Sequence, residues 1–349
     1  MDIRDRIQTF IEVGRILAGF PGTEAEGAHH PLTEPALLAE ARNRWFTQSS
    51  IRYALNALGE SMSAGKIERW LDPYMSFLDV KETAGKTIGV VTAGNIPLAG
   101  FHDFLTVLVS GHTFCGKLSG QDAVLIPAIA GIMENLNPEW KQRILFTDEP
   151  FRTIDAIIAT GSGNTYRYFD YYFSRYPHII RKNRNSIAVL NGHETDDENK
   201  GLVSDVMLYF GLGCRSVSKI YIPASYDILQ LQPFFEPWSS VIRHNKFFNN
   251  YEYQKSILIV NRKEFHDFGN ILLTGDGRLA SPVSVLNFER YTEPGILSEH
   301  LLTQAEQIQC VVSVSCPGLN CLPPGAAQKP GLWDYADGID TLRFLLEEI

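Results

Sequence analysis

Short apolar runs alternate with longer helix-like segments from about residue 85 onward, and this alternation constrains the fold more than any other feature of the sequence. Strands are predicted at 87–91, 113–118, 144–146 and 156–160, with helices at 101–110 and 121–135 between them. The run at 87–91 is Thr-Ile-Gly-Val-Val, an apolar stretch typical of strands that are buried on both faces of a parallel sheet. Parallel strands joined by helices need right-handed crossovers, so the pattern predicts a doubly wound α/β sheet.

A second α/β unit is predicted to begin near residue 190. Its expected elements are a strand at 186–190, a helix at 202–210 and strands at 220–222, 256–260 and 283–288. Residues 1 to about 80 are predicted to be helical, because apolar side chains recur there at helical spacing. The chain of 349 residues is therefore long enough for two or three domains with substantial cores.

Composition and charge exclude several classes of partner. The formal net charge is −9 and no long basic run is present, so a nucleic-acid partner is not expected. No apolar stretch approaches the roughly 20 residues of a membrane span, and residues 1–6 do not resemble a signal peptide. The five cysteines are odd in number and scattered, which favours reduced thiols and a cytoplasmic protein. Their spacing does not fit a zinc site, so no metal is expected.

Cys214 is the first candidate for chemistry. It lies in the segment Gly-Leu-Gly-Cys-Arg-Ser at 211–216, between an expected helix and an expected strand. The flanking glycines lack side-chain bulk and permit unusual backbone angles, so a substrate could approach the thiol closely. A thiolate attacks acyl carbons well. A buried, inert cysteine is the alternative when Cys214 is considered alone.

Two loops in the first unit follow predicted strands, where ligands bind in such folds. Asn95 lies in Gly-Asn-Ile-Pro after the first strand, and its amide could donate to a developing oxyanion or serve as a helix N-cap. Gly161 opens the turn Gly-Ser-Gly-Asn-Thr at 161–165, which could hold a phosphate or be a plain turn.

The order of these motifs resembles the aldehyde dehydrogenase superfamily over roughly residues 85–290. That family places an oxyanion-hole Asn in W-N-x-P, a ribose-binding Lys in K-P-[AS]-E, a T-G-S turn at the cofactor and a nucleophilic Cys in G-Q-x-C. The resemblance implies Cys214 as nucleophile and Asn95 as oxyanion donor. The residues that it implies for cofactor binding are Lys117, Ser119, Gly161 and Ser162.

Three segments are similar to the acyl-coenzyme A reductase branch, which includes the fatty-acyl reductase of bacterial luminescence: residues 93–98, 211–219 and 334–338. The implied fold is aldehyde dehydrogenase-like, a Rossmann-type parallel-sheet cofactor domain plus an α/β catalytic domain that carries the nucleophilic Cys. The expected boundaries are 1–190 for the helical region and NAD(P)-binding domain and 191–320 for the catalytic domain. A C-terminal segment over 321–349 is expected to pack back on both.

Departures from the wider family refine the expected reaction. Aldehyde-oxidising members carry E-L-G-G-K, whose Glu activates water for thioester hydrolysis, whereas the aligned stretch 179–183 begins with Ile179. Gly120 replaces the acidic residue that holds the adenosine ribose in NAD-preferring members, which favours NADPH since a carboxylate would repel a 2′-phosphate. Arg278 occupies the position of the Glu that holds the nicotinamide ribose, and His102 is either a site residue or a polar helix residue.

The sequence thus predicts NAD(P)H-dependent reduction of an acyl-CoA, of the fatty-acyl type, to the aldehyde through a Cys214 acyl-enzyme. NADPH is favoured and NADH stays open, as does acyl carrier protein as the acyl donor. Two alternatives remain: a non-acylating aldehyde dehydrogenase, and a cofactor-binding subunit that docks an acyl-activating ligase or acyl carrier protein. The resemblance also implies self-association or a complex with such a ligase, without integral membrane contact.

Overall fold

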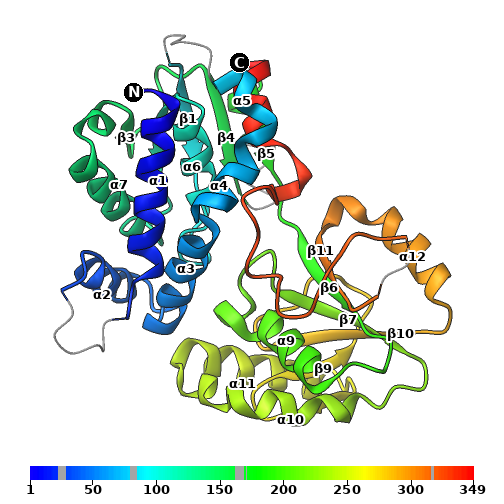
Figure 1. Ribbon diagram of the computed structural model, residues 1–349. Coiled ribbons are helices and arrows are strands. Elements are labelled where there is room, and N and C mark those ends of the chain that lie inside the picture. Colours follow the sequence, from blue (N-terminus) through cyan, green and yellow to red (C-terminus); the bar gives the residue numbers. More distant parts are fainter. Residues whose placement is uncertain (23–28, 79–84, 162–168, 170, 316–317) are drawn as a thin grey trace. The chain divides into compact units, whose positions relative to one another are not determined.

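The computed structural model describes residues 1–22, 29–78, 85–161, 169, 171–315 and 318–349. The chain divides into two compact units (Figure 1). Unit 1 comprises Met1–Asn183 and Lys329–Ile349, and unit 2 comprises Arg184–Gln328. The chain therefore leaves unit 1, builds all of unit 2 and returns to unit 1.

Unit 1 contains a five-stranded sheet in the order β3-β2-β1-β4-β5, with every neighbouring pair parallel. This order confirms the predicted doubly wound sheet, because the chain moves outward from β1 to β3 and then resumes on the other side of β1 with β4. The three central residues of β1 are buried, as predicted from the apolar sequence. The strands are β1 (Thr87–Val91), β2 (Thr113–Lys117), β3 (Ile144–Phe146), β4 (Ala156–Thr160) and β5 (His178–Arg181).

Helices cover the sheet of unit 1. Helix α6 packs on β1 and β2, and α1 packs against α3, α6 and α7. A core cluster of unit 1 contains Ile154 and Ile157, with Phe151, Phe169 and Phe173 packed against it. The helices are α1 (Ile3–Ala18), α2 (Thr33–Arg42), α3 (Gln48–Ser61), α4 (Ala64–Leu71), α5 (Met75–Leu78), α6 (Phe101–Val109), α7 (Leu125–Leu136) and α13 (Thr341–Arg343).

The C-terminal segment, residues 329–349, is fixed to the helices of unit 1 by polar side chains. The Trp70 indole donates to the Tyr335 hydroxyl over 2.8 Å, and the Tyr74 hydroxyl donates to Asp340 over 2.6 Å. The His102 ring bonds the Leu332 carbonyl at 2.8 Å and packs against Trp70 and Tyr335. His102 is thus a helix residue that holds the C-terminal segment.

Unit 2 is built on a seven-stranded sheet in the order β12-β11-β6-β7-β10-β9-β8, parallel except for the β8–β9 pair. The strands are β6 (Asn185–Val189), β7 (Val217–Pro223), β8 (Phe265–Asp267), β9 (Leu272–Gly275), β10 (Val285–Tyr291), β11 (Ile308–Val312) and β12 (Cys321–Leu322). The helices are α9 (Asp196–Met207), α10 (Gln232–Phe235), α11 (Asn245–Val260) and α12 (Pro294–Thr303). Ile187, Tyr221 and Leu301 belong to one core cluster, and Tyr251 and Leu272 to another.

Three expectations about unit 2 and the cysteines are wrong. The predicted strand at 256–260 is the last part of α11, where Ile259 and Val260 are apolar yet 58% and 80% exposed. The predicted helix at 202–210 is helical only to Met207, because Leu208 is extended, and Tyr209 and Phe210 then adopt left-handed backbone angles. Cys321 is in a disulfide, so the cysteines are not all reduced thiols.

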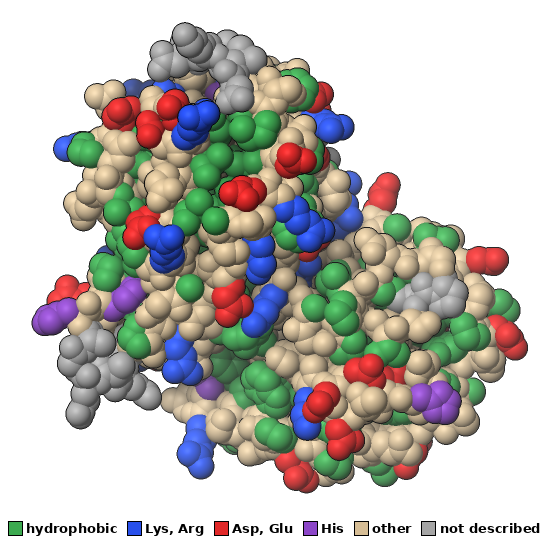
Figure 2. All heavy atoms as spheres, in the orientation of Figure 1, with side chains coloured by type: hydrophobic (Ala, Val, Ile, Leu, Met, Phe, Trp, Pro, Cys, Tyr) green, Lys and Arg blue, Asp and Glu red, His purple; other side chains and the backbone are tan. Residues whose placement is uncertain are grey.

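The surface and the helix lengths bear on the classes of partner considered above. Figure 2 shows acidic and basic side chains interspersed on the visible face of unit 1. Of the helices that lie within the described ranges, none combines the length and the apolar character needed to cross a membrane.

Candidate functional site

Cys214 lies on a tight turn of unit 2, between α9 and β7, and the residue is exposed. Within the turn, the Ser216 amide donates to the Gly213 carbonyl at 3.0 Å and the Gly213 amide donates to Ser216 Oγ at 3.2 Å. The alternative of a buried Cys214 is therefore wrong, since the residue is exposed.

The chain enters this turn through three successive residues with positive φ. The values are 54° at Tyr209, 58° at Phe210 and 73° at Gly211. Only the glycine adopts this conformation without steric cost, whereas each aromatic residue loses about 1–2 kcal/mol. Strain of this kind persists when the surrounding structure fixes it, and it concentrates at functional sites.

Ser186 on β6 holds the Cys214 turn in place. This contact was not predicted from the sequence. Ser186 Oγ donates to the Cys214 carbonyl at 2.9 Å and lies 3.0 Å from Cys310 Sγ on β11. The Gln328 side-chain amide donates to Ser216 Oγ of the turn at 3.2 Å. These partners are separated from the turn by 28 to 112 positions in the sequence, so no local pattern could have indicated them.

Cys310 and Arg278 differ in their electrostatic surroundings. Burial is the main cause that raises the pKa of the Cys310 thiol, and the positive charge of Arg215 opposes this increase. Arg278, which aligns with a ribose-binding Glu in the wider family, instead forms an ion pair with Asp276 at 2.7 Å. This ion pair lowers the pKa of Asp276.

The loop that contains Arg278 is anchored by buried side chains of β7 and β10. Lys219 Nζ donates to the Gly277 carbonyl at 2.7 Å, and Asn287 donates to the Arg278 carbonyl at 3.0 Å. Ser218 Oγ lies within hydrogen-bond distance of the Leu279 carbonyl, at 2.8 Å, and of the Ser186 carbonyl, at 3.2 Å, and its single hydroxyl hydrogen is shared between them. The loop is thus joined to the strand that supports Cys214.

In unit 1, Asn95 is exposed on the loop that follows β1. Helix α6 begins at Phe101 with Gly100 as its N-cap, so the alternative interpretation of Asn95 as the N-cap is wrong. Leu98 in this loop has a φ of 62°, and its amide donates to buried Asp122 over 2.7 Å. The Asn95 loop is therefore fixed by the chain that follows β2.

The loops after β1 and β2 also contact each other directly. The Ser119 amide donates to Thr92 Oγ1 at 3.2 Å. A Cβ atom at Gly94 would lie only 2.4 Å from Ser119 Oγ, so glycine is required at this point of contact. Lys117 is the last residue of β2 and Gly161 directly follows β4.

The strand order brings the sequence-predicted residues of unit 1 to one edge of the sheet. Since β1 lies between β2 and β4 and all three are parallel, Lys117, Ser119, the Asn95 loop and Gly161 follow neighbouring carboxyl ends. The order reverses at β1 and β4, and ligands of doubly wound sheets bind at such a reversal. The arrangement fits a nucleotide cofactor. Ser162 lies outside the described residues.

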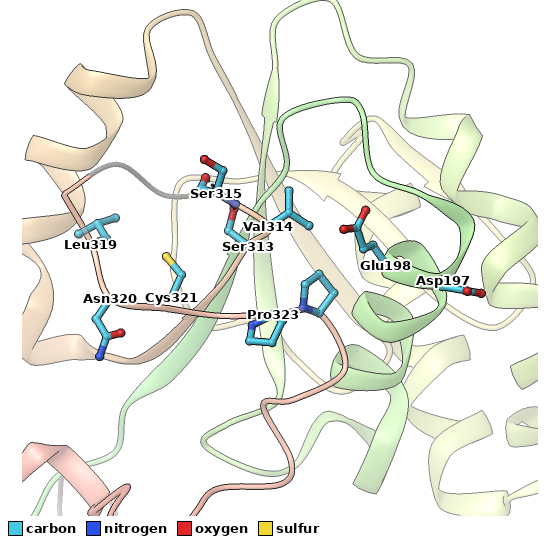
Figure 3. A pocket seen from close by; sticks show the side chains of 10 residues that line it. Asp197, Glu198, Ser313, Val314, Ser315, Leu319, Asn320, Cys321 and Pro323 are labelled. Carbon is cyan, nitrogen blue, oxygen red and sulfur yellow. Dashed lines mark hydrogen bonds between the residues drawn. The ribbon is translucent and has the colours of Figure 1, made fainter.

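A separate hollow on unit 2 has a volume of about 680 Å³. Figure 3 shows Glu198 and Asp197 of α9 on one side of it and Ser313, Val314 and Cys321 on the other. Glu198 caps its own helix there, accepting from the Thr195 amide at 2.7 Å. Cys214 does not line this hollow. The hollow is therefore not part of the candidate site around Cys214.

No protein-family model and no curated protein matches the chain. Solved structures do match it. One is a mutant of aldehyde dehydrogenase AldC from Pseudomonas syringae in complex with NAD⁺ and octanal, with 11% identity, a TM-score of 0.61, and coverage of 90% of this chain and 72% of that one. Another is an NAD-dependent benzaldehyde dehydrogenase from Corynebacterium glutamicum, with 11% identity, a TM-score of 0.60, and coverage of 91% and 77%.

The aldehyde dehydrogenase KauB from Pseudomonas aeruginosa matches with 13% identity, a TM-score of 0.57, and coverage of 90% of this chain and 72% of that one. These identities are low, so the similarity concerns the three-dimensional arrangement of the chain. That arrangement agrees with the fold predicted from the order of the motifs. The chain has the aldehyde dehydrogenase fold.

Proposed function

We propose that this chain is an NAD(P)H-dependent acyl-CoA reductase, which converts an acyl thioester to an aldehyde through an acyl-enzyme on Cys214. The observation that carries the proposal is the exposed thiol of Cys214 on a fixed turn, in a chain with the aldehyde dehydrogenase fold. The similar AldC structure contains octanal, an aliphatic aldehyde of the class that a fatty-acyl reductase would form.

In the first step, the Cys214 thiolate attacks the carbonyl carbon of the acyl thioester. The Asn95 amide and the Cys214 backbone N–H would donate to the oxyanion of the tetrahedral intermediate. The carbon–sulfur bond to coenzyme A then breaks, and coenzyme A leaves as a thiolate that takes up a proton from solvent. The acyl group remains on Cys214 as a thioester.

Bound NAD(P)H would supply the hydride that reduces this thioester to a hemithioacetal. Lys117, Ser119, Gly161 and Ser162 would hold the cofactor. The Asn95 amide would stabilise the alkoxide, as proposed for the first step. Breaking the remaining carbon–sulfur bond releases the aldehyde and returns Cys214 as a thiolate.

Ile179 supports reduction over hydrolysis. It lies on β5 and is only 4% exposed, and its side chain cannot accept a proton from water. A general base typically accelerates such water attack by 10²- to 10⁴-fold, so an acyl-enzyme without that base would persist long enough to accept hydride.

The first test follows cofactor oxidation and trapped aldehyde during anaerobic incubation with acyl-CoAs of graded length and NADPH or NADH. We expect wild-type protein to form aldehyde and a mass-detectable thioester on Cys214. Cys214→Ala should lose both and still bind the cofactor, while the control Cys115→Ala should retain both. Full reductase activity in Cys214→Ala, or aldehyde oxidation that needs no coenzyme A, would overturn the proposal.

The environment of Gly120 supports a preference for NADPH. The residue is exposed, and a Cβ atom at this position would meet no atom within 4 Å. An acidic side chain could therefore be introduced at this position without a clash. We expect Gly120→Glu to lower kcat/KM for NADPH by about tenfold or more through charge repulsion, with little change for NADH. The isosteric control Gly120→Gln should affect NADPH much less. Equal effects of the two substitutions on NADPH would contradict this preference.

A further inference from the structure

Ser186 lies at an irregular point of the sheet in unit 2. Its two neighbouring strands both shift register beside it: β11 between Ile308 and Val311, and β7 between its pairings with Ser186 and Ile187. Register shifts of this kind re-aim side chains and are over-represented beside active sites. The side chain of Ser186 is completely buried, and its hydroxyl lies between the Cys214 carbonyl and the Cys310 thiol.

The hydrogen positions in this contact follow from the number of donors. A serine hydroxyl has one hydrogen, and Ser186 donates it to the Cys214 carbonyl at 2.9 Å. The contact of 3.0 Å with Cys310 Sγ must then be a hydrogen bond from the thiol to the serine oxygen. Such a bond needs Cys310 in its protonated form, which its buried setting on β11 favours.

Two consecutive hydrogen bonds therefore run from the Cys310 S–H to the Ser186 oxygen and from the Ser186 O–H to the Cys214 carbonyl. Because the peptide group is planar, fixing this carbonyl also fixes the orientation of the following amide of Arg215. The hydrogen bond to the carbonyl also limits rotation about the Cα–C bond of Cys214. The directions in which the thiol can point are thereby restricted. Mutual polarisation strengthens consecutive hydrogen bonds of this type.

We propose that Ser186 is a positioning residue for the Cys214 nucleophile and that Cys310 acts through Ser186 as its thiol donor. The proposal deepens the acyl-CoA reductase function proposed above and rests on it for the natural substrate. Neither residue touches the acyl group. Their role is to hold the nucleophile in one orientation during acyl transfer.

Four variants test the proposal in the full chain: Ser186→Ala removes both hydrogen bonds, Cys310→Ala removes the thiol donor, Cys310→Ser restores a donor, and Cys115→Ala is the control. Single-turnover acylation by an acyl-CoA gives the rate of thioester formation on Cys214. We expect Ser186→Ala to slow it on the order of 10- to 100-fold with KM nearly unchanged, as for a misplaced reacting group. Cys310→Ala should slow it less, and Cys310→Ser should approach the wild-type rate.

A second measurement does not depend on the reductase function. The rate at which iodoacetamide alkylates Cys214, followed by peptide mass spectrometry, should change in Ser186→Ala and Cys310→Ala and recover in Cys310→Ser. The infrared S–H band that disappears in Cys310→Ala should shift to higher frequency in Ser186→Ala, because the thiol loses its acceptor. This band and the pair of Cys310 variants remain informative should Ser186→Ala fold poorly.

The outcomes separate this proposal from the proposed function. Wild-type protein that forms no thioester with any acyl-CoA overturns the reductase function, and the alkylation rates and the S–H band then decide the role of Ser186. Ser186→Ala and Cys310→Ala proteins that match wild type in alkylation, with an unshifted S–H band in Ser186→Ala, overturn the positioning role. An equal loss in Cys310→Ala and Cys310→Ser overturns the donor role of Cys310.

Discussion

Asp122 joins the Asn95 loop to the chain after β2, and its carboxyl group is buried. Its Oδ2 accepts from the Leu98 amide, while its Oδ1 has no hydrogen-bond partner among the described residues. Burial raises the pKa of Asp122 to about 7, and the Leu98 hydrogen bond opposes this increase. The carboxyl group that fixes the loop is therefore largely protonated in mildly acidic solution.

The raised pKa of Asp122 determines how pH affects stability. Between the ordinary value of 3.8 and about 7, the folded chain keeps a proton that the unfolded chain releases. The contribution to stability is therefore complete at the acidic end and falls by about 1.4 kcal/mol per pH unit as the pH rises through this window. We expect Asp122→Asn to lose this slope in denaturant unfolding followed from about pH 4 to 8.

Asp205 in unit 2 provides a comparison for this experiment. It accepts from the Gly325 and Ala327 amides, and burial raises its pKa to about 6. The slope removed by Asp205→Asn should therefore end about one pH unit lower than the slope removed by Asp122→Asn. An Asp122→Asn protein with the wild-type pH dependence would show that Asp122 titrates at its ordinary pKa.

At the scale of elements, β5 is an edge strand held to α6 by a buried ion pair. Arg181 is 4% exposed and Asp103 is 5% exposed, and Arg181 Nη2 lies 2.8 Å from Asp103 Oδ1. The same guanidinium donates to Thr341 Oγ1 at 2.9 Å. Three elements that are distant in the sequence therefore share one charged contact.

Removing one member of this pair should cost more than removing both. Arg181→Met leaves the Asp103 carboxylate buried without its cation, and we expect a loss of about 3–5 kcal/mol in the free energy of unfolding of unit 1. The double variant Arg181→Met/Asp103→Leu should recover most of this loss, because apolar side chains can replace a buried ion pair. Urea unfolding of both variants measures the difference, and a double variant that loses as much stability as Arg181→Met, or more, would contradict the coupling.

The sequence allowed prediction of elements that have a strong local pattern. The predicted strand at 87–91 matches β1, since its apolar residues indicate burial on both faces. The strand predicted at 256–260 is wrong because the Ile and Val residues of this run favour strands when considered alone. In the structure, the run is the end of a helix of 16 residues. Short β8 and β9 have too few residues for a recognisable alternation.

The candidate site could be predicted where chemistry and chain order coincide. Cys214 lies on its expected turn, Lys117 is the last residue of β2, and Asn95 and Gly161 follow the neighbouring strands β1 and β4. The contact between Ser186 and Cys310 could not be predicted, because it joins residues 124 positions apart through register shifts on adjacent strands. Such shifts depend on tertiary packing and leave no mark in the local sequence.

At the scale of the whole molecule, unit 1 is discontinuous and depends on residues 329–349 for its core. This segment contributes four buried apolar side chains: Leu332, Leu342, Phe344 and Leu345. At about 1.5–3 kcal/mol each, their burial is comparable to the entire stability of a typical domain. Unit 1 therefore needs residues that are more than 140 positions away from the rest of it.

Deleting residues 329–349 should leave unit 1 unfolded at about 25 °C while unit 2 stays folded, because unit 2 is contiguous. Limited proteolysis with peptide mass spectrometry should then show protected peptides only from 184–328. As a mild control, Tyr335→Phe in the full chain removes two hydroxyl contacts and should cost about 1–3 kcal/mol. Protection of peptides from both units after the deletion would contradict the dependence of unit 1 on the C-terminal segment.

The return of the chain to unit 1 also affects how the protein forms on the ribosome. Domains generally fold as units during synthesis, and every residue of unit 2 is translated before residue 329. The Cys214 turn can therefore reach its native structure while the parallel sheet of unit 1 still lacks its closing segment. During this interval the nascent chain would expose the apolar surface of α6 and its neighbours, which makes the incomplete unit 1 the part of the chain most in need of a chaperone.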